Sequence, residues 1–76
     1  MILTPREQEV AILIGKGYKD QEIAEELGVS RRRVCQIVSS IKEKWDVQSR
    51  VEIGVLAYQF GWISVPGEKS LLDILR

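Results

Sequence analysis

The chain has 76 residues, 45% of them hydrophobic, and its 11 basic and 11 acidic side chains cancel at pH 7. This length predicts one domain with a small core, and one cysteine with no histidine excludes an internal disulfide and a Cys/His metal cluster. The sequence starts without a basic region followed by an apolar one and has no apolar run long enough to cross a bilayer, so we expect a cytoplasmic protein with no membrane partner.

The first predicted helix begins after Thr4. Thr4 can cap the exposed amides, Pro5 suits the first helical position, and Glu7 can complete a capping box. The helix should end near Gly15 because glycine disfavours a helix interior. Its inward residues recur at helical spacing; they are Val10, Leu13 and Ile14.

A short second helix is predicted over residues 20–27, with Ile23, Ala24 and Leu27 facing inward. The next three residues are Gly28, Val29 and Ser30. Glycine can adopt the left-handed turn conformation, valine can enter the core, and serine can cap a following helix. A helix, a short turn containing glycine and a second helix are typical of a helix-turn-helix motif.

The third predicted helix, residues 31–45, separates into two faces at about 100° per residue. The core side holds Val34, Ile37, Val38, Ile41 and Trp45. The opposite side holds Arg32, Cys35, Gln36 and Ser39, and Arg31 and Arg33 flank it. Such a helix suits the DNA major groove, since the centre of its exposed face can meet base edges while its flanks meet phosphates.

The fourth predicted helix, residues 50–60, begins with a second capping box formed by Ser49 and Glu52. It carries more apolar groups than one face can bury, which favours a homodimer interface. The alternative is that the tail, residues 64–76, covers this surface with one or two helical turns after a turn at Pro66-Gly67. The residues expected at the dimer interface are Val51, Val55, Tyr58, Gln59 and Trp62.

Charge is segregated along the neutral chain. Residues 1–30 carry three basic and six acidic side chains, residues 31–50 carry six and two, and residues 51–76 carry two and three. A basic segment centred on the third helix predicts a localised phosphate-binding face.

The exposed side chains of the third helix match known modes of DNA contact. Arg32 can donate two hydrogen bonds to the O6/N7 edge of guanine, and Gln36 can pair with the N6/N7 edge of adenine. Ser39 and Cys35 complete the predicted base-reading set, with Cys35 as a small side chain that permits close approach. The predicted phosphate ligands are Ser30, Arg31, Arg33, Lys19 and Lys42.

The sequence resembles the LuxR/GerE-type DNA-binding domain over residues 2–63. The matching segments are Leu3 to Val10, Gly17, Glu22-Ile23-Ala24, Leu27, Val29-Ser30, Val34, Ile41, Lys44, Val47, Arg50 and Gly61-Trp62-Ile63. The resemblance implies an all-α, four-helix domain of the winged-helix-like superfamily. It also implies a two-fold dimer on a promoter and base reading at the positions of Cys35, Gln36 and Ser39.

Some positions depart from that family. Threonine is common where Arg33 stands, a basic residue where Cys35 stands, and histidine where Ile37 stands. Lys19 and Asp20 replace a usual serine or threonine and a usual asparagine. These departures affect the expected DNA target more than the fold.

Residues 22–37 are also similar to region 4 of bacterial sigma factors, in which Arg31, Arg32 and Gln36 would read the promoter −35 element. The pattern of the fourth helix favours the LuxR/GerE type.

We therefore predict a small transcriptional regulator, with residues 1–63 as the DNA-binding domain, that binds double-stranded DNA as a homodimer. An alternative is a protein-interaction module that acts on RNA polymerase or on another regulator. An enzyme is not expected, because histidine is absent and no glycine-rich phosphate loop is present. We also expect no cofactor, metal or small-molecule ligand.

Overall fold

The computed structural model describes residues 2–63 as four helices, and no strand occurs within this part of the chain. The helices are α1 (Pro5–Gly15), α2 (Asp20–Leu27), α3 (Arg31–Trp45) and α4 (Arg50–Gln59). The predicted all-α class is confirmed. Helix α4 ends one residue earlier than predicted, because Phe60 is its C-cap. The predicted turn and helix of the tail lie outside the described residues.

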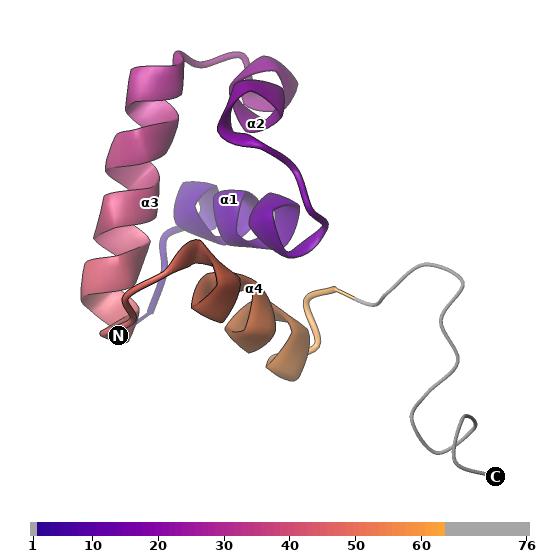
Figure 1. Cartoon of the computed structure of the whole chain (residues 1–76), viewed down its shortest axis with the longest axis vertical. Coiled ribbons are helices and arrows are strands. Elements are labelled where there is room, and N and C mark those ends of the chain that lie inside the picture. Colours follow the sequence, from indigo (N-terminus) through magenta and orange to yellow (C-terminus); the bar gives the residue numbers. More distant parts are fainter. Residues whose placement is uncertain (1, 64–76) are drawn as a thin grey trace, which may run out of the picture.

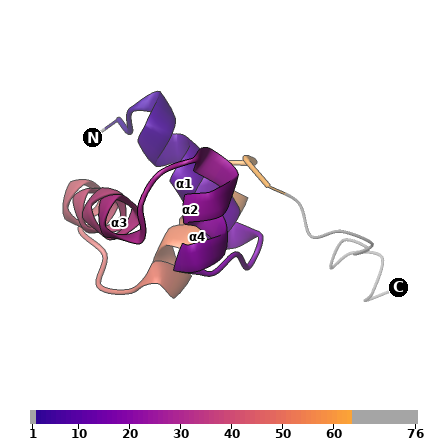
Figure 2. The same cartoon turned by 90° about the horizontal axis from the view of Figure 1, so that it is seen from above.

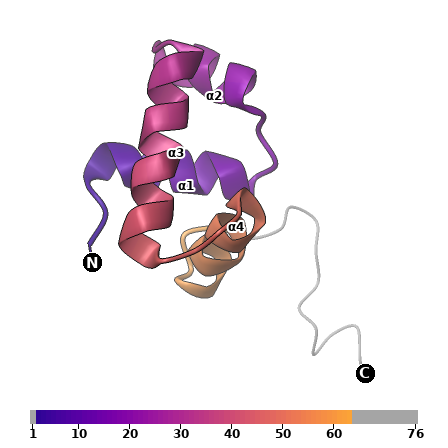
Figure 3. The same cartoon turned by 60° about the vertical axis from the view of Figure 1, so that its left-hand side comes forward.

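Helix α3 stands along one side of the other three helices (Figure 1). Viewed from above, α3 is seen end-on while α1, α2 and α4 overlap on one side of it (Figure 2). A third view shows α2 near the start of α3 and α4 near its end, with α1 crossing behind its middle (Figure 3). The far side of α3 is therefore left uncovered by any other helix in the described chain.

Local signals form the helix boundaries largely as predicted. The Glu7 amide donates to Thr4 Oγ1 at 3.2 Å and the Thr4 amide donates to Glu7 Oε1 at 2.8 Å, which completes the first capping box. In the turn before α3, Gly28 is left-handed with φ of 68°, as expected for a helix C-cap. Ser30 Oγ then accepts from the Arg33 amide at 3.1 Å.

The second predicted capping box forms only in part. Ser49 Oγ accepts from the Glu52 amide at 3.3 Å, as predicted. The return bond to Glu52 Oε1 comes from the Ser49 hydroxyl and not from the Ser49 backbone amide. The cap therefore relies on one hydroxyl group.

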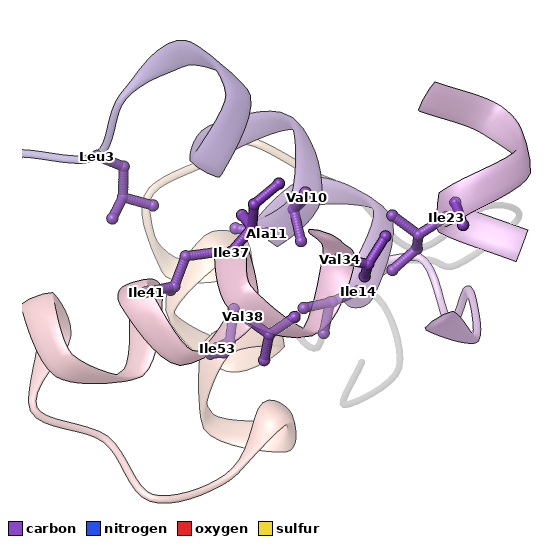
Figure 4. Packing of buried hydrophobic residues seen from close by; sticks show 11 residues of the cluster. Leu3, Val10, Ala11, Ile14, Ile23, Val34, Ile37, Val38, Ile41 and Ile53 are labelled. Atoms are coloured by element: carbon purple, nitrogen blue, oxygen red, sulfur yellow. The ribbon is translucent and has the colours of Figure 1, made fainter. Parts of the chain in front are cut away.

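The core lies where α1, α3 and α4 cross and extends to α2 (Figure 4). Helix α3 contributes four of the five residues predicted to face inward, and Trp45 is half-buried against Phe60 and Trp62. Three further residues of the core were not predicted from helical spacing to face inward. They are Leu3, Ala11 and Ile53. The buried cluster comprises Leu3, Val10, Ala11, Ile14, Ile23, Ala24, Val34, Ile37, Val38, Ile41 and Ile53.

Helices α1 and α4 approach closely at a pair of glycines. A Cβ atom added to Gly54 would lie 3.3 Å from the Cα atom of Gly15, so the two backbones are nearly in contact. Glycine at position 54 suits this close approach, because a side chain there would press on the Gly15 backbone. This crossing places α4 beneath α1 without touching the outer side of α3.

One carboxylate is buried within this helical frame. The Glu7 residue is only 6% exposed, and its two oxygens accept from Lys44 Nζ at 2.6 Å, from Ser40 Oγ and from the Thr4 amide. Burial by itself raises the pKa of Glu7, but the bonds from Lys44, Ser40 and Thr4 outweigh it and lower the pKa from 4.5 to about 2. The carboxylate thus joins the start of α1 to the second half of α3.

The lowered pKa predicts an acid-sensitive contribution to stability. Because the folded-state pKa of Glu7 is depressed, this contribution is present above about pH 4.5 and is lost as the pH falls toward 2. The shift corresponds to about 3 kcal/mol of unfolding free energy. Urea unfolding of the natural chain and of Glu7→Gln across this range should show the natural chain losing about that much more stability. Parallel pH profiles for the two proteins would contradict the prediction.

Candidate nucleic-acid interface

The outer side of α3 presents the four residues predicted to read bases. Arg32, Cys35, Gln36 and Ser39 are all exposed, whereas the inward residues from Val34 to Ile41 are buried. Because residues three and four apart share a helix face, these four side chains form one stripe along the first two turns. We call these four residues the outer stripe. No other described helix covers it (Figure 2).

The two flanks of the outer stripe contact different helices. On the flank that includes Arg33, Ser40 and Lys44 bond to Glu7 of α1. On the opposite flank, Cys35 Sγ lies 3.9 Å from Asp20 Oδ2 at the start of α2. Helix α3 is therefore held against rotation from both sides, and the outer stripe keeps one orientation relative to the domain.

A second ion pair joins the start of α4 to the start of α2. The guanidinium of Arg50 donates to Asp20 Oδ1 and also to the backbone carbonyl of Tyr18 at 2.8 Å. The planar guanidinium thus binds both the first side chain of α2 and the backbone of the loop before α2. Asp20 is in turn the carboxylate beside Cys35, so this clamp extends to the edge of the outer stripe.

The predicted phosphate ligands occupy both flanks of the outer stripe. Lys19 and Arg31 line a common groove beside the start of α2, and Arg33 lies on the opposite flank at helical spacing. The Ser30 hydroxyl caps α3 by accepting from the Arg33 amide. The amides before it, at Arg31 and Arg32, have no acceptor within the helix, as is general for the start of a helix. Lys42 is half-buried on the Arg31 flank, about 16 Å farther along the axis.

Helix α4 exposes apolar side chains on the surface predicted to mediate dimerisation. Val51 is 71% exposed, and Val55 and Tyr58 are each 50% exposed. These three residues line the same groove as Arg31.

The other two residues predicted at the dimer interface lie apart from that groove lining. Gln59 is exposed. Trp62 is half-buried and packs against Trp45 and Phe60 within its own chain, with ring centroids 5.8 and 5.5 Å away.

Sequence reasoning did not identify the two ion pairs that join the helices, Glu7 with Lys44 and Arg50 with Asp20. It assigned Glu7 only to the capping box, and it named Asp20 only as a departure from the usual family residue. The spacing of Ser40 and Lys44, four residues apart on α3, places both on one helix face toward a possible acceptor. Nothing in the sequence paired Arg50 with Asp20, because 30 residues separate them.

Residues 2–63 contain neither a membrane-spanning helix nor a metal site. No helix within residues 2–63 is long and apolar enough to span a bilayer. Within the same residues, no group of three or more His, Cys, Asp or Glu side chains is arranged to hold a metal ion.

Comparison with known proteins identifies the family. Residues 1–57 match the family described as bacterial regulatory proteins, luxR family. The chain belongs to the LuxR family. It is also 40% identical over 62 residues to proteins named response regulator protein VraR from Staphylococcus aureus, Staphylococcus saprophyticus and Staphylococcus epidermidis. Each match covers 82% of this chain and 30% of the relative, so the chain spans less than a third of their length.

The match places all four helices in the LuxR-family helix-turn-helix domain, because residues 1–57 include everything but the last turn of α4. In this domain α2 and α3 form the helix-turn-helix, as the sequence predicted. The family membership therefore supports transcription regulation through DNA binding.

The clamp between Arg50 and Asp20 predicts measurable coupling. Arg50→Gln and Asp20→Ala should each lower the free energy of unfolding by about 1–2 kcal/mol, since each leaves a partly buried partner without its bond. The double variant should lose less than the sum of the two. The matched control is Arg33→Gln, which removes an exposed arginine and should change stability by less than about 0.5 kcal/mol. Additive effects in urea unfolding would show that the two residues do not interact.

Proposed function

We propose that this LuxR-family domain binds double-stranded DNA in a sequence-specific manner as a small transcriptional regulator, with the outer stripe of α3 in the major groove. The observation that carries the proposal is the exposed stripe of Arg32, Cys35, Gln36 and Ser39. Arginines lie on both of its flanks, and the bonds from Ser40 and Lys44 to Glu7 lie on one flank, away from these four residues. A major groove admits one α-helix presented in this way. Such a regulator would act in the cytoplasm.

Base reading is assigned to the outer stripe. Arg32 donates to guanine O6 and N7, and Gln36 both donates to and accepts from adenine. Ser39, about one turn farther along, can bond to a base or a phosphate. Cys35 is a small side chain that permits close approach, and its thiol lies beside the Asp20 carboxylate. A phosphate is therefore disfavoured at that edge, and a base edge with a hydrogen-bond donor is favoured.

Phosphate binding is assigned to the flanks. Lys19 and Arg31 face one phosphate wall, together with the first amides of α3. Arg33 faces the other wall, and Lys42 extends the first flank toward the end of the helix. This local concentration of basic side chains would let a chain of zero net charge bind a polyanion.

A homodimer is assigned to α4. Val51, Val55 and Tyr58 expose enough apolar surface along one helix to pair with a symmetry-related copy. Gln59 would lie at the rim, and Trp62 would support the end of α4 from within its own chain. Two recognition helices related in this way would read half-sites about one DNA turn, roughly 34 Å, apart.

The salt dependence of DNA binding tests the phosphate assignments. A dimer with about eight phosphate contacts should lose roughly 10³–10⁵ in affinity between about 50 and 200 mM salt. Arg31→Ala and Arg33→Ala should each reduce the slope of log affinity against log salt by about one per protomer. Fluorescence anisotropy on duplexes selected from random sequences would measure this.

The matched control is Gln36→Ala, which should keep the slope and cost about 1–3 kcal/mol of preference for the selected base. A folded protein that binds no duplex at low salt would contradict DNA binding and favour an interaction with RNA polymerase or another regulator.

A single charge on α4 tests the dimer. Val55→Asp places a carboxylate on the proposed interface at a half-exposed position, so the fold should persist while the two-fold contact is lost. Analytical ultracentrifugation should show a monomer, and binding to a duplex with two half-sites should fall to that of one half-site. Ile2→Asp adds the same charge at a 92% exposed apolar residue that does not line the groove of Val51, Val55 and Tyr58 and should keep both properties. Equal self-association of the two variants would reject the α4 interface.

A further inference from the structure

An apolar groove runs along α4 and is bounded by the end of α1 and the start of α2. It encloses about 1180 Å³. Gly15 and Gly54 lie at its floor, and the Ile63 side chain lies over Gly15. Its walls are mostly apolar and include Ile14, Val51, Val55, Tyr58 and Ile63, and Lys19 and Arg31 lie at one end. A groove with a glycine floor and aliphatic walls fits the apolar face of a helix.

The chain itself leads into this groove. After α4, Gly61 turns with φ of 78° and the Trp62 amide bonds back to the Ala57 carbonyl at 3.0 Å. The Ile63 side chain then lies over Gly15, so that its Cδ1 atom would collide with any side chain added there. Because Ile63 lines the groove, the described part of the chain ends at the groove wall. The segment after residue 63 therefore needs no long linker to reach the groove.

The sequence after Ile63 has the composition that such a groove requires. Pro66-Gly67 predicts a turn, and at helical spacing the four aliphatic residues of 68–76 fall within one arc of about 160° while Lys69, Ser70 and Asp73 lie opposite. Nine helical residues would extend roughly 14 Å, close to the roughly 15 Å of the ten-residue α4. The aliphatic residues are Leu71, Leu72, Ile74 and Leu75.

We propose that residues 68–76 form an amphipathic helix that binds in the groove along α4, antiparallel to it, with its aliphatic face over Gly54 and Val55. The linking segment, residues 64–67, is so short that the effective concentration of this helix at the groove is in the millimolar range. A second copy of the chain with the same intrinsic affinity for the groove must exceed that concentration to displace the tail. In the isolated monomer the tail is therefore the favoured occupant.

The docked tail would regulate dimerisation. Val51, Val55 and Tyr58 line the groove and are also the residues assigned to the dimer, so one surface cannot hold both occupants. This consequence rests on the proposed function, whereas the docking itself does not. If the groove is free in about one tenth of the molecules, self-association is weakened by at least about tenfold.

The position of the tail can be measured in the full chain by paramagnetic relaxation. A nitroxide would be attached to Ser70→Cys in a Cys35→Ser background, and the amide signals of the ¹⁵N-labelled protein recorded. We expect the strongest broadening at Val51, Val55 and Tyr58 and the weakest near Leu3 and Trp45. A mixture of ¹⁵N chains without nitroxide and unlabelled chains with it should show no such broadening. Broadening that persists in the mixture, or no preference for the groove, would overturn the proposal.

Matched tail variants separate docking from dimerisation. Leu72→Ser with Leu75→Ser should abolish the broadening in the groove, whereas Lys69→Ser with Asp73→Ser, on the polar side, should retain it. The first pair should also tighten self-association by about tenfold in ultracentrifugation. If both pairs keep the broadening, the aliphatic face does not dock and the proposal fails. If broadening behaves as expected but no variant dimerises, the dimer proposal fails and tail docking stands.

Discussion

The buried carboxylate of Glu7 determines how α3 lies on the rest of the domain. It caps α1 through the Thr4 amide and at the same time accepts from Ser40 and Lys44 on α3. Hydrophobic packing alone would hold the inward face of α3 without fixing its rotation closely, because the aliphatic cluster has no direction. A charged acceptor with a fixed set of donors supplies that direction. The outer stripe therefore points away from α1 in the free protein, so that less conformational freedom would be lost in the proposed binding to DNA.

The opposite flank of α3 depends on a weaker and more exposed clamp. Arg50 holds Asp20 and the Tyr18 carbonyl, and Asp20 lies beside Cys35. Because this chain carries an aspartate where an asparagine is usual in LuxR-type domains, the flank has a negative charge that Arg50 partly neutralises. The same aspartate lies beside Cys35, one of the residues proposed to read bases. One carboxylate thus takes part both in the contact between helices and in the proposed DNA-binding surface.

Helix α4 lies next to one flank of the proposed DNA-binding surface. Its inner residues Ile53 and Ala57 are buried, and Gly54 permits close contact with α1. Its outer residues form a groove that ends at Arg31, a residue assigned to a phosphate. An occupant of this groove, whether a second copy or the tail, would therefore lie next to the DNA-binding flank. That proximity gives the domain a route by which association and DNA affinity can influence each other.

The helices, their caps and the two faces of α3 could be predicted from the sequence, because each depends on neighbours within about four residues. These local features are the Thr4 cap, the Gly28 turn, the Ser30 cap and the buried residues of α3 from Val34 to Ile41. The sequence also predicted which residues of α3 would be exposed. Only the tertiary structure decided that Glu7 meets Ser40 and Lys44, that Arg50 meets Asp20, and that Trp62 packs away from Val51, Val55 and Tyr58. Those contacts join residues about 30 or more positions apart or depend on which way a helix end turns. Local spacing carries no information about such distances, since the packing angles of the helices set them.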